Sequence, residues 1–133
     1  MCYDNSSVNS MKGKTKSTLV AWEGDSLDVL RSFPKAVRED LGYDLRRLQN
    51  GEQPLNSRPM KSIGKRVYEL KQQDNRGWYR MIYLSKVGDT IFILHCFRKQ
   101  SRKTSQKDLN VAKERLKNVL ARIREEKKHE RKT

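Results

Sequence analysis

A basic stretch in the last third of the chain holds the residues best suited to chemistry. Residues 95–107 read HCFRKQSRKTSQK and carry five Lys and Arg with no acidic residue. Arg80 also interrupts an otherwise apolar segment, WYRMIY. A buried or half-buried arginine needs an anionic partner or a ligand. The basic stretch is therefore either a solvated loop or, together with Arg80, the edge of a site that handles phosphate.

The overall charge favours a polyanionic partner. The 133 residues include 30 Lys and Arg against 16 Asp and Glu, a formal net charge of +14. Such an excess binds phosphate-rich surfaces through charge neutralisation and counterion release. Cys2 and Cys96 lie far apart, and His95 and His129 have no Cys or carboxylate neighbours at the spacing of metal ligands. We expect no disulfide framework, no metal site and no cofactor.

One reaction suits a site made of cations with at most a carboxylate, an imidazole or a hydroxyl group. In the cleavage of RNA by its own 2′-hydroxyl, the substrate supplies both the nucleophile and the leaving group. The protein has to orient them, move protons and stabilise the extra negative charge of the transition state. Arginine and lysine supply much of this, without a metal ion.

The elements that must position these residues follow from periodicity and turn residues. Strands are predicted at residues 17–22, 65–71, 78–85 and 90–97, and helices at 26–33, 34–50 and 105–123, with a loop at 52–64. Ser105 and Asp108 resemble a capping box at the start of the last helix. The fold class is α+β, a small antiparallel or mixed four-stranded sheet with two N-terminal helices and a C-terminal helix.

The predicted domain occupies residues 17–124. Residues 1–16 are expected to form a flexible basic arm, and residues 125–133, which lack apolar partners, a frayed charged tail. No apolar stretch approaches the length that spans a bilayer. We expect a cytoplasmic protein with no membrane partner.

Three motifs in this order carry a resemblance to a known family. RVYEL, WYRMIY and IFILHCFRKQSRKT, followed by a helix, resemble the RelE/HigB superfamily of toxins from type II toxin-antitoxin modules, especially its phage-derived HigB-like branch. The resemblance covers about residues 17–123. It implies a RelE-like fold and an endoribonuclease, an mRNA interferase that cuts messenger RNA on the ribosome. A cognate antitoxin, a helix-turn-helix protein encoded adjacently, would neutralise it.

Two other functions stay open at this point. Relatives of ParE type share the fold but inhibit DNA gyrase without catalysis, and a basic phage accessory protein would only bind nucleic acid. The compact basic cluster after the last strand favours RNA over gyrase. The resemblance also has departures, because this chain has Val67 and Glu69 where RelE has two lysines.

Four residues are candidates for catalysis, and the resemblance assigns roles to two of them, Arg80 and Lys99. Arg80 matches the strand arginine that contacts the scissile phosphate, although a salt bridge with Glu69 across the hairpin would also explain it. Lys99 matches the basic residue just after the last strand. Glu69 either serves as the general base or orients Arg80, which we favour. His95 either faces the cleft or completes a core strand, and we favour the second.

The remaining candidates would bind RNA without taking part in the chemistry. Basic side chains would contact the RNA backbone or simply be solvated. Trp78 would stack on a base or close a hairpin. These candidates are Lys65, Arg66, Arg98, Arg102, Lys103 and Trp78.

Overall fold

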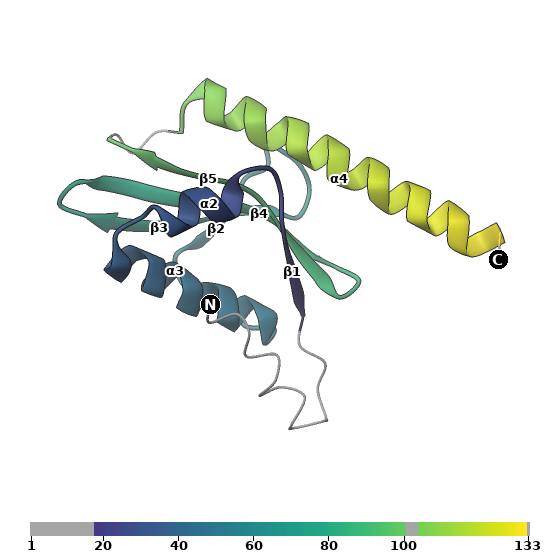
Figure 1. Ribbon diagram of the computed structural model, residues 1–133, viewed down its shortest axis with the longest axis horizontal. Helices are drawn as coiled ribbons and strands as arrows, with labels where there is room; N and C mark the ends of the chain where they lie inside the picture. The colour runs from purple at the N-terminus through teal and green to yellow at the C-terminus, as the bar shows by residue number, and fades with distance from the viewer. Residues whose placement is uncertain (1–17, 101–103, 133) are drawn as a thin grey trace.

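The chain folds into a five-stranded sheet with helices on both faces (Figure 1). The computed structural model describes residues 18–100 and 104–132. In chain order the elements are β1 (Leu19–Trp22), α2 (Ser26–Arg31), α3 (Lys35–Gln49), β2 (Ser57–Pro59), β3 (Val67–Asp74), β4 (Gly77–Val87), β5 (Thr90–Lys99) and α4 (Gln106–Lys132).

The sheet is mixed. The strand order is β1-β5-β4-β3-β2, with β1 parallel to β5 and every other pair antiparallel. The predicted α+β class, the three-strand meander and the placement of the helices are confirmed. The strand count is five instead of four, because Ser57–Pro59 pairs with β3 inside the predicted loop. A three-residue strand is too short to show alternation, and its proline is tolerated at a sheet edge.

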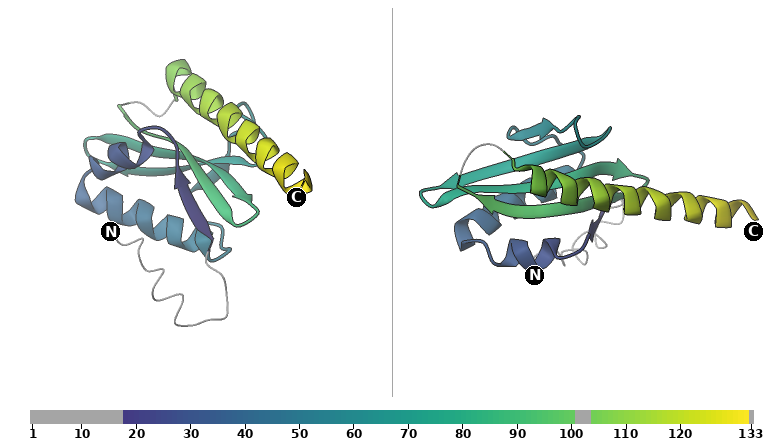
Figure 2. Two further views of the ribbon diagram at one scale, coloured as in Figure 1. Left: turned by 45° about the vertical axis from the view of Figure 1, so that its right-hand side comes forward. Right: turned by 90° about the horizontal axis from the view of Figure 1, so that it is seen from above.

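Helices cover both faces of the sheet (Figure 2), and each face has its own hydrophobic core. On one face, α2 and α3 supply the apolar stripe that the sequence predicts, including Leu30, Leu41 and Leu45. The other face packs against α4. The central strand β5 is buried on both sides, and this explains its nearly continuous apolar run.

The helix α4 begins at the predicted cap and extends further than its apolar stripe. Ser105 Oγ accepts a hydrogen bond from the Asp108 backbone N–H at 3.2 Å and donates one to Asp108 Oδ2 at 2.7 Å. The helix continues to Lys132, and its last turns project beyond the sheet (Figure 1). The predicted fraying from residue 125 stays a prediction. Among the described helices, none is long and apolar enough to cross a membrane.

Candidate functional site

Arg80 and Glu69 form a buried ion pair on the α4 side of the sheet. Arg80 Nη1 lies 2.9 Å from Glu69 Oε2, and their side chains are 4% and 2% exposed. Thr104 Oγ1 closes a triangle, because it accepts from Arg80 Nη1 at 3.2 Å and donates to Glu69 Oε2 at 3.2 Å. The cross-hairpin salt bridge considered for Arg80 is therefore present, and it orients the guanidinium group.

One nitrogen of this buried arginine lacks a partner. Within the described residues, Arg80 Nε is buried and makes no hydrogen bond. The guanidinium carbon lies 5.8 Å from the centre of the Trp78 ring. An unsatisfied buried donor costs about 1–3 kcal/mol, and the cost is larger for a charged group. Such a cost at a functional site is the mark of a donor that serves a ligand.

Two lysines share the face of the sheet that carries Arg80. Lys71 is paired with Arg80 in the β3–β4 register, and Lys99 is paired with Trp78 in the β4–β5 register. Because side chains alternate along a strand, these four residues point to the same side. The term Arg80 site is used below for this set together with its buried partners: Glu69, Lys71, Trp78, Arg80, Lys99 and Thr104.

Lys71 is the member of this site that sequence reasoning missed. In KRVYELK the alternation that puts Val67 and Glu69 on one face also puts Lys71 there. Its Nζ lies 5.8 Å from the centre of the Trp78 ring. This alternation is visible in the sequence, but only the register with β4 places Lys71 directly opposite Arg80.

Asp108, expected only as a cap, joins α4 to the edge of the site. One oxygen lies 2.9 Å from His95 Nε2 and the other 3.6 Å from Lys99 Nζ. Burial by itself raises the pKa of the Asp108 carboxyl group. Hydrogen bonds from His95 and Ser105, with the charges of His95 and Lys99, outweigh burial and lower that pKa below its ordinary value.

His95 is enclosed on all sides of its ring. The residue is 8% exposed, and its ring stacks on Phe97 with 4.9 Å between centroids. Arg115 Nη1 approaches His95 Nδ1 at 3.5 Å. On the other side of the ring, His95 Nε2 lies 2.9 Å from Asp108 Oδ1. This geometry favours a structural histidine that fastens α4 to the sheet, and a catalytic role for His95 stays a prediction.

The structure does not bring the other basic candidates to Arg80. Lys65 and Arg66 are exposed ahead of β3, and Arg66 is about 17 Å along the strand from Lys71. Arg98 alternates to the face opposite Lys99, where its Nη2 donates to the Arg76 carbonyl at 3.2 Å. Two further candidates, Arg102 and Lys103, lie outside the described residues.

The site has the composition of a phosphate-binding surface. Within residues 18–100 and 104–132, no cluster of three or more His, Cys, Asp or Glu is arranged to hold a metal ion. The positive groups that do gather are the guanidinium of Arg80 and the ammonium groups of Lys71 and Lys99. These cations around a half-buried aromatic ring suit an oxyanion next to a base.

Comparisons with known proteins agree with this architecture. No curated protein matches the sequence. The structure of a mutant of the E. coli toxin RelE in the free state is 16% identical, with a TM-score of 0.53 over 78% of this chain and 99% of that one. The isolated E. coli RelE toxin is 19% identical over 80% of this chain and 99% of that one, with a TM-score of 0.47.

A further solved structure, the RelBE2 toxin-antitoxin complex from Mycobacterium tuberculosis, has a chain that is 15% identical. The match covers 63% of this chain and 100% of that chain, with a TM-score of 0.46. The family model described as "Phage derived protein Gp49-like" matches residues 28–117, about two thirds of the sequence. The predicted phage-derived family is confirmed by this match, and the predicted RelE-like fold by the likeness to the free RelE mutant. The chain belongs to the phage-derived Gp49-like family and has the fold of the RelE toxins.

Proposed function

We propose that this protein is the toxin of a toxin-antitoxin module and that it cleaves messenger RNA at the Arg80 site. The observation that carries the proposal is the buried Arg80, whose Nε has no hydrogen-bond partner among the described residues while Glu69 and Thr104 hold the rest of the group in place. A fixed guanidinium that lacks one hydrogen bond is prepared for an oxyanion. The likeness to the fold of the E. coli toxin RelE supports this function.

The proposed chemistry is attack by the 2′-hydroxyl group on the adjacent phosphate, without a metal ion. Arg80 contacts the phosphate through Nε, and the negative charge that grows on the phosphorane-like transition state is stabilised by Arg80 and Lys99. Lysines have flexible stems, so Lys71 and Lys99 give way to an entering strand and then close on its phosphates. The products are a 2′,3′-cyclic phosphate and a 5′-hydroxyl end.

In this mechanism Glu69 is a positioning residue. Its Oε2 accepts hydrogen bonds from both Arg80 and Thr104, so the carboxylate holds the guanidinium instead of taking a proton from the substrate. We assign the same kind of role to Asp108, which places Lys99 at the edge of the site.

The test is cleavage by the purified protein on translating ribosomes in the presence of EDTA, with message ends mapped at nucleotide resolution. We expect cuts that carry cyclic phosphates, made by the wild type and by Arg31→Ala, an exposed arginine of α2. Arg80→Ala and Lys99→Met should abolish them. Lys99 is partly exposed, so its variant keeps the fold even if Arg80→Ala does not.

Intact messages with the wild type, or cleavage that EDTA removes, would contradict the proposed mechanism. An unchanged growth defect with Lys99→Met and Arg80→Ala would remove both residues from the site. Unchanged toxicity without any cleavage of RNA would point to a non-catalytic poison, as in the ParE type.

The proposed function also implies the partners of the protein and the compartment in which it acts. Messenger RNA and ribosomes place the protein in the cytoplasm, and a toxin of this type requires an antitoxin, expected to be a helix-turn-helix protein from the adjacent reading frame. Expressing that frame together with the toxin should restore growth and yield a complex that purifies as one species. Growth arrest that the adjacent product does not relieve would contradict this pairing.

A further inference from the structure

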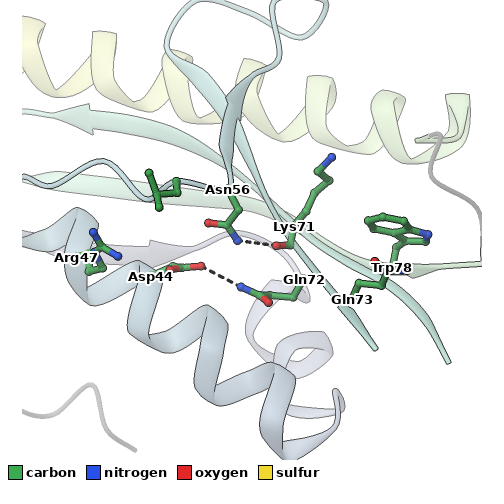
Figure 3. Close-up of a pocket in the computed structure, with 8 residues that line it drawn as sticks. Asp44, Arg47, Asn56, Lys71, Gln72, Gln73 and Trp78 are labelled. Carbon is green, nitrogen blue, oxygen red and sulfur yellow. Dashed lines mark hydrogen bonds between the residues drawn. The ribbon is translucent and has the colours of Figure 1, made fainter. Parts of the chain in front are cut away.

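A polar cavity of about 540 Å³ opens at the edge of the sheet beside the Arg80 site (Figure 3). This volume is in the usual range for small-molecule sites, about 300–1,000 Å³. Its walls come from α3, from the loop before β2, from β3 and from the start of β4. The lining residues are Asp44, Arg47, Leu55, Asn56, Lys71, Gln72, Gln73 and Trp78.

The cavity exists because β2 is short and begins only at Ser57. The pairing of β2 with β3 ends at Ser57 and Leu70, so β3 is the edge of the sheet from Lys71 onward. Asn56 Nδ2 donates to the Lys71 carbonyl at 2.6 Å, which ends the ladder. Lys71 points toward the α4 side and Gln72 toward α3 (Figure 3). The cavity therefore passes around the open edge, from the Arg80 site to the α3 side of the sheet.

The lining of the cavity includes a buried carboxylate. Asp44, on α3, is 7% exposed, and its Oδ2 accepts a hydrogen bond from Gln72 Nε2 at 3.2 Å (Figure 3). A buried carboxylate favours a ligand that presents N–H donors, since charge-assisted hydrogen bonds are the strong ones. Around it lie amide side chains and the guanidinium of Arg47, whose Nε donates to Glu52 Oε1 at 3.1 Å and whose other nitrogens suit carbonyl and ring-nitrogen acceptors.

The aromatic wall of the cavity belongs to both sites. Trp78 lines the cavity, and its ring centre lies 5.8 Å from the guanidinium carbon of Arg80. Bases of single-stranded RNA stack on aromatic side chains while their edges are read by hydrogen bonds. A nucleotide whose phosphate is held by Arg80 would therefore lie beside the aromatic wall of the cavity.

We propose that this cavity binds the guanine base of a nucleotide next to the scissile phosphate. Guanine presents two N–H donors on the edge that would face Asp44 and two acceptors on the edge that would face Arg47 or Lys71. No other RNA base combines these two edges. This inference rests on the proposed function, because the strand is the one whose phosphate Arg80 contacts.

The test is a titration of the ¹⁵N-labelled protein with each of the four nucleoside 5′-monophosphates, followed by NMR. We expect GMP to shift the side-chain amide signals of Asn56, Gln72 and Gln73 and the indole N–H signal of Trp78. The other three nucleotides should shift them at least about tenfold more weakly, since a hydrogen bond to a charged group is worth that factor.

The variant Asp44→Asn keeps the shape of the side chain and should reduce GMP affinity about tenfold or more. The matched control is Asp40→Asn, an exposed aspartate one turn earlier on α3, which should leave the titration unchanged. Thermal unfolding shows whether each variant is folded. If Asp44→Asn does not fold, the comparison of the four nucleotides on the wild type still tests whether the cavity prefers guanine.

Equal responses to all four nucleotides, or a response that Asp44→Asn leaves intact, would overturn the guanine subsite. A lack of response to any nucleotide would overturn it as well, and would favour an extended polypeptide on the open edge of β3. The titration does not depend on cleavage. A protein that cuts messages with no response to GMP refutes the subsite alone, and one that binds GMP but leaves messages intact refutes the proposed reaction alone.

Discussion

At the scale of single residues, the central feature is a charge buried together with its counter-charge. Arg80 and Glu69 are both almost fully covered, and Thr104 links them. Desolvating two charges costs several kcal/mol for each ion, and their attraction offsets this only when the geometry is good. The pair is thus weak as a source of stability, and its purpose is to hold the guanidinium group in one orientation.

Removing only one partner of this pair should be strongly destabilising. We expect Glu69→Ala to lower the free energy of unfolding by about 3–5 kcal/mol, because it leaves the Arg80 charge buried and uncompensated. Urea denaturation measures this. The control is Glu39→Ala, whose carboxylate is 65% exposed and pairs with Lys35 at 3.9 Å. That exposed pair should contribute at most about 1 kcal/mol.

A double variant separates the stability of the site from its function. Glu69→Leu combined with Arg80→Met removes both charges and fills the same space, so it should unfold near the wild-type urea concentration. It should nevertheless lack all cleavage activity. A double variant as unstable as Glu69→Ala would show that the loss comes from packing instead of an unpaired charge.

Asp108 should make the stability of the protein sensitive to acid. Its pKa is below the ordinary value of 3.8 in the folded protein, where His95 and Ser105 hydrogen-bond to it. A lowered pKa in the folded state stabilises the fold above the unfolded-state pKa, and this stabilisation disappears as the pH falls through the folded-state pKa. The sensitive range therefore lies below about pH 4 to 5.

The measurement is the free energy of unfolding of the wild type and of Asp108→Asn at several pH values. The gap between the two should be constant near neutral pH, and should shrink as the pH falls below about 4. Parallel curves down to the most acidic sample would mean that Asp108 contributes nothing through its charge.

At the scale of elements, a β-bulge determines where His95 points. Ile82 pairs with His95, but the next residue, Tyr83, pairs with Ile93, so Leu94 is the extra residue on β5. A bulge resets the alternation of side chains. Leu94 joins the core beneath α4, and His95 meets Asp108 on the same side. Arg115, on α4, donates to the Leu94 carbonyl at 3.0 Å.

The packing of α4 on the sheet should contribute strongly to the stability of the fold. Leu116 is 7% exposed in the core beneath α4, whereas Leu120, one turn later, is 39% exposed. We expect Leu116→Ala to lower the free energy of unfolding by about 2–5 kcal/mol, through lost burial and the remaining cavity. Leu120→Ala, the same change on the same helix, should cost much less. Similar urea midpoints for the two variants would argue against the packing of α4 described above.

At the scale of the whole molecule, positive charge is widespread, but only part of it lies at the Arg80 site. The net charge of +14 attracts nucleic acid from any direction. Lys71 and Lys99 share the face of Arg80, whereas Lys65, Arg66 and Arg98 lie elsewhere. General attraction and the specific phosphate contact should therefore be separable by experiment.

The dependence of RNA binding on salt concentration separates general electrostatic attraction from a specific phosphate contact. The logarithm of the affinity for a non-cleavable single strand should fall linearly with the logarithm of salt concentration. Lys71→Met should reduce the slope by about one unit or slightly less, the loss of one phosphate contact. The control is Lys35→Met on α3, an exposed lysine that removes the same charge. Fluorescence anisotropy measures the affinity of each variant. Equal slopes for Lys71→Met and the control Lys35→Met would remove Lys71 from the interface.

Much of this protein is readable from the sequence because local patterns determine it. Helical periodicity identifies the stripes of α3 and α4, turn residues separate three strands, and the Ser105 cap marks where the last helix starts. An arginine inside an apolar strand next to a glutamate one strand away predicts a pair, and the pair is present. These signals depend on residues close together in sequence or on burial alone.

Only the tertiary structure decided which charges act together. The register between β3 and β4 places Lys71 opposite Arg80, and the bulge at Leu94 turns His95 to Asp108. The start of β2 at Ser57 leaves the edge of β3 open beside Asp44 and forms the cavity. Register, bulges and strand ends arise from pairing between distant segments, and a shift of one residue reverses every side chain. Because no local pattern encodes that choice, the sequence predicts a basic site but not its members.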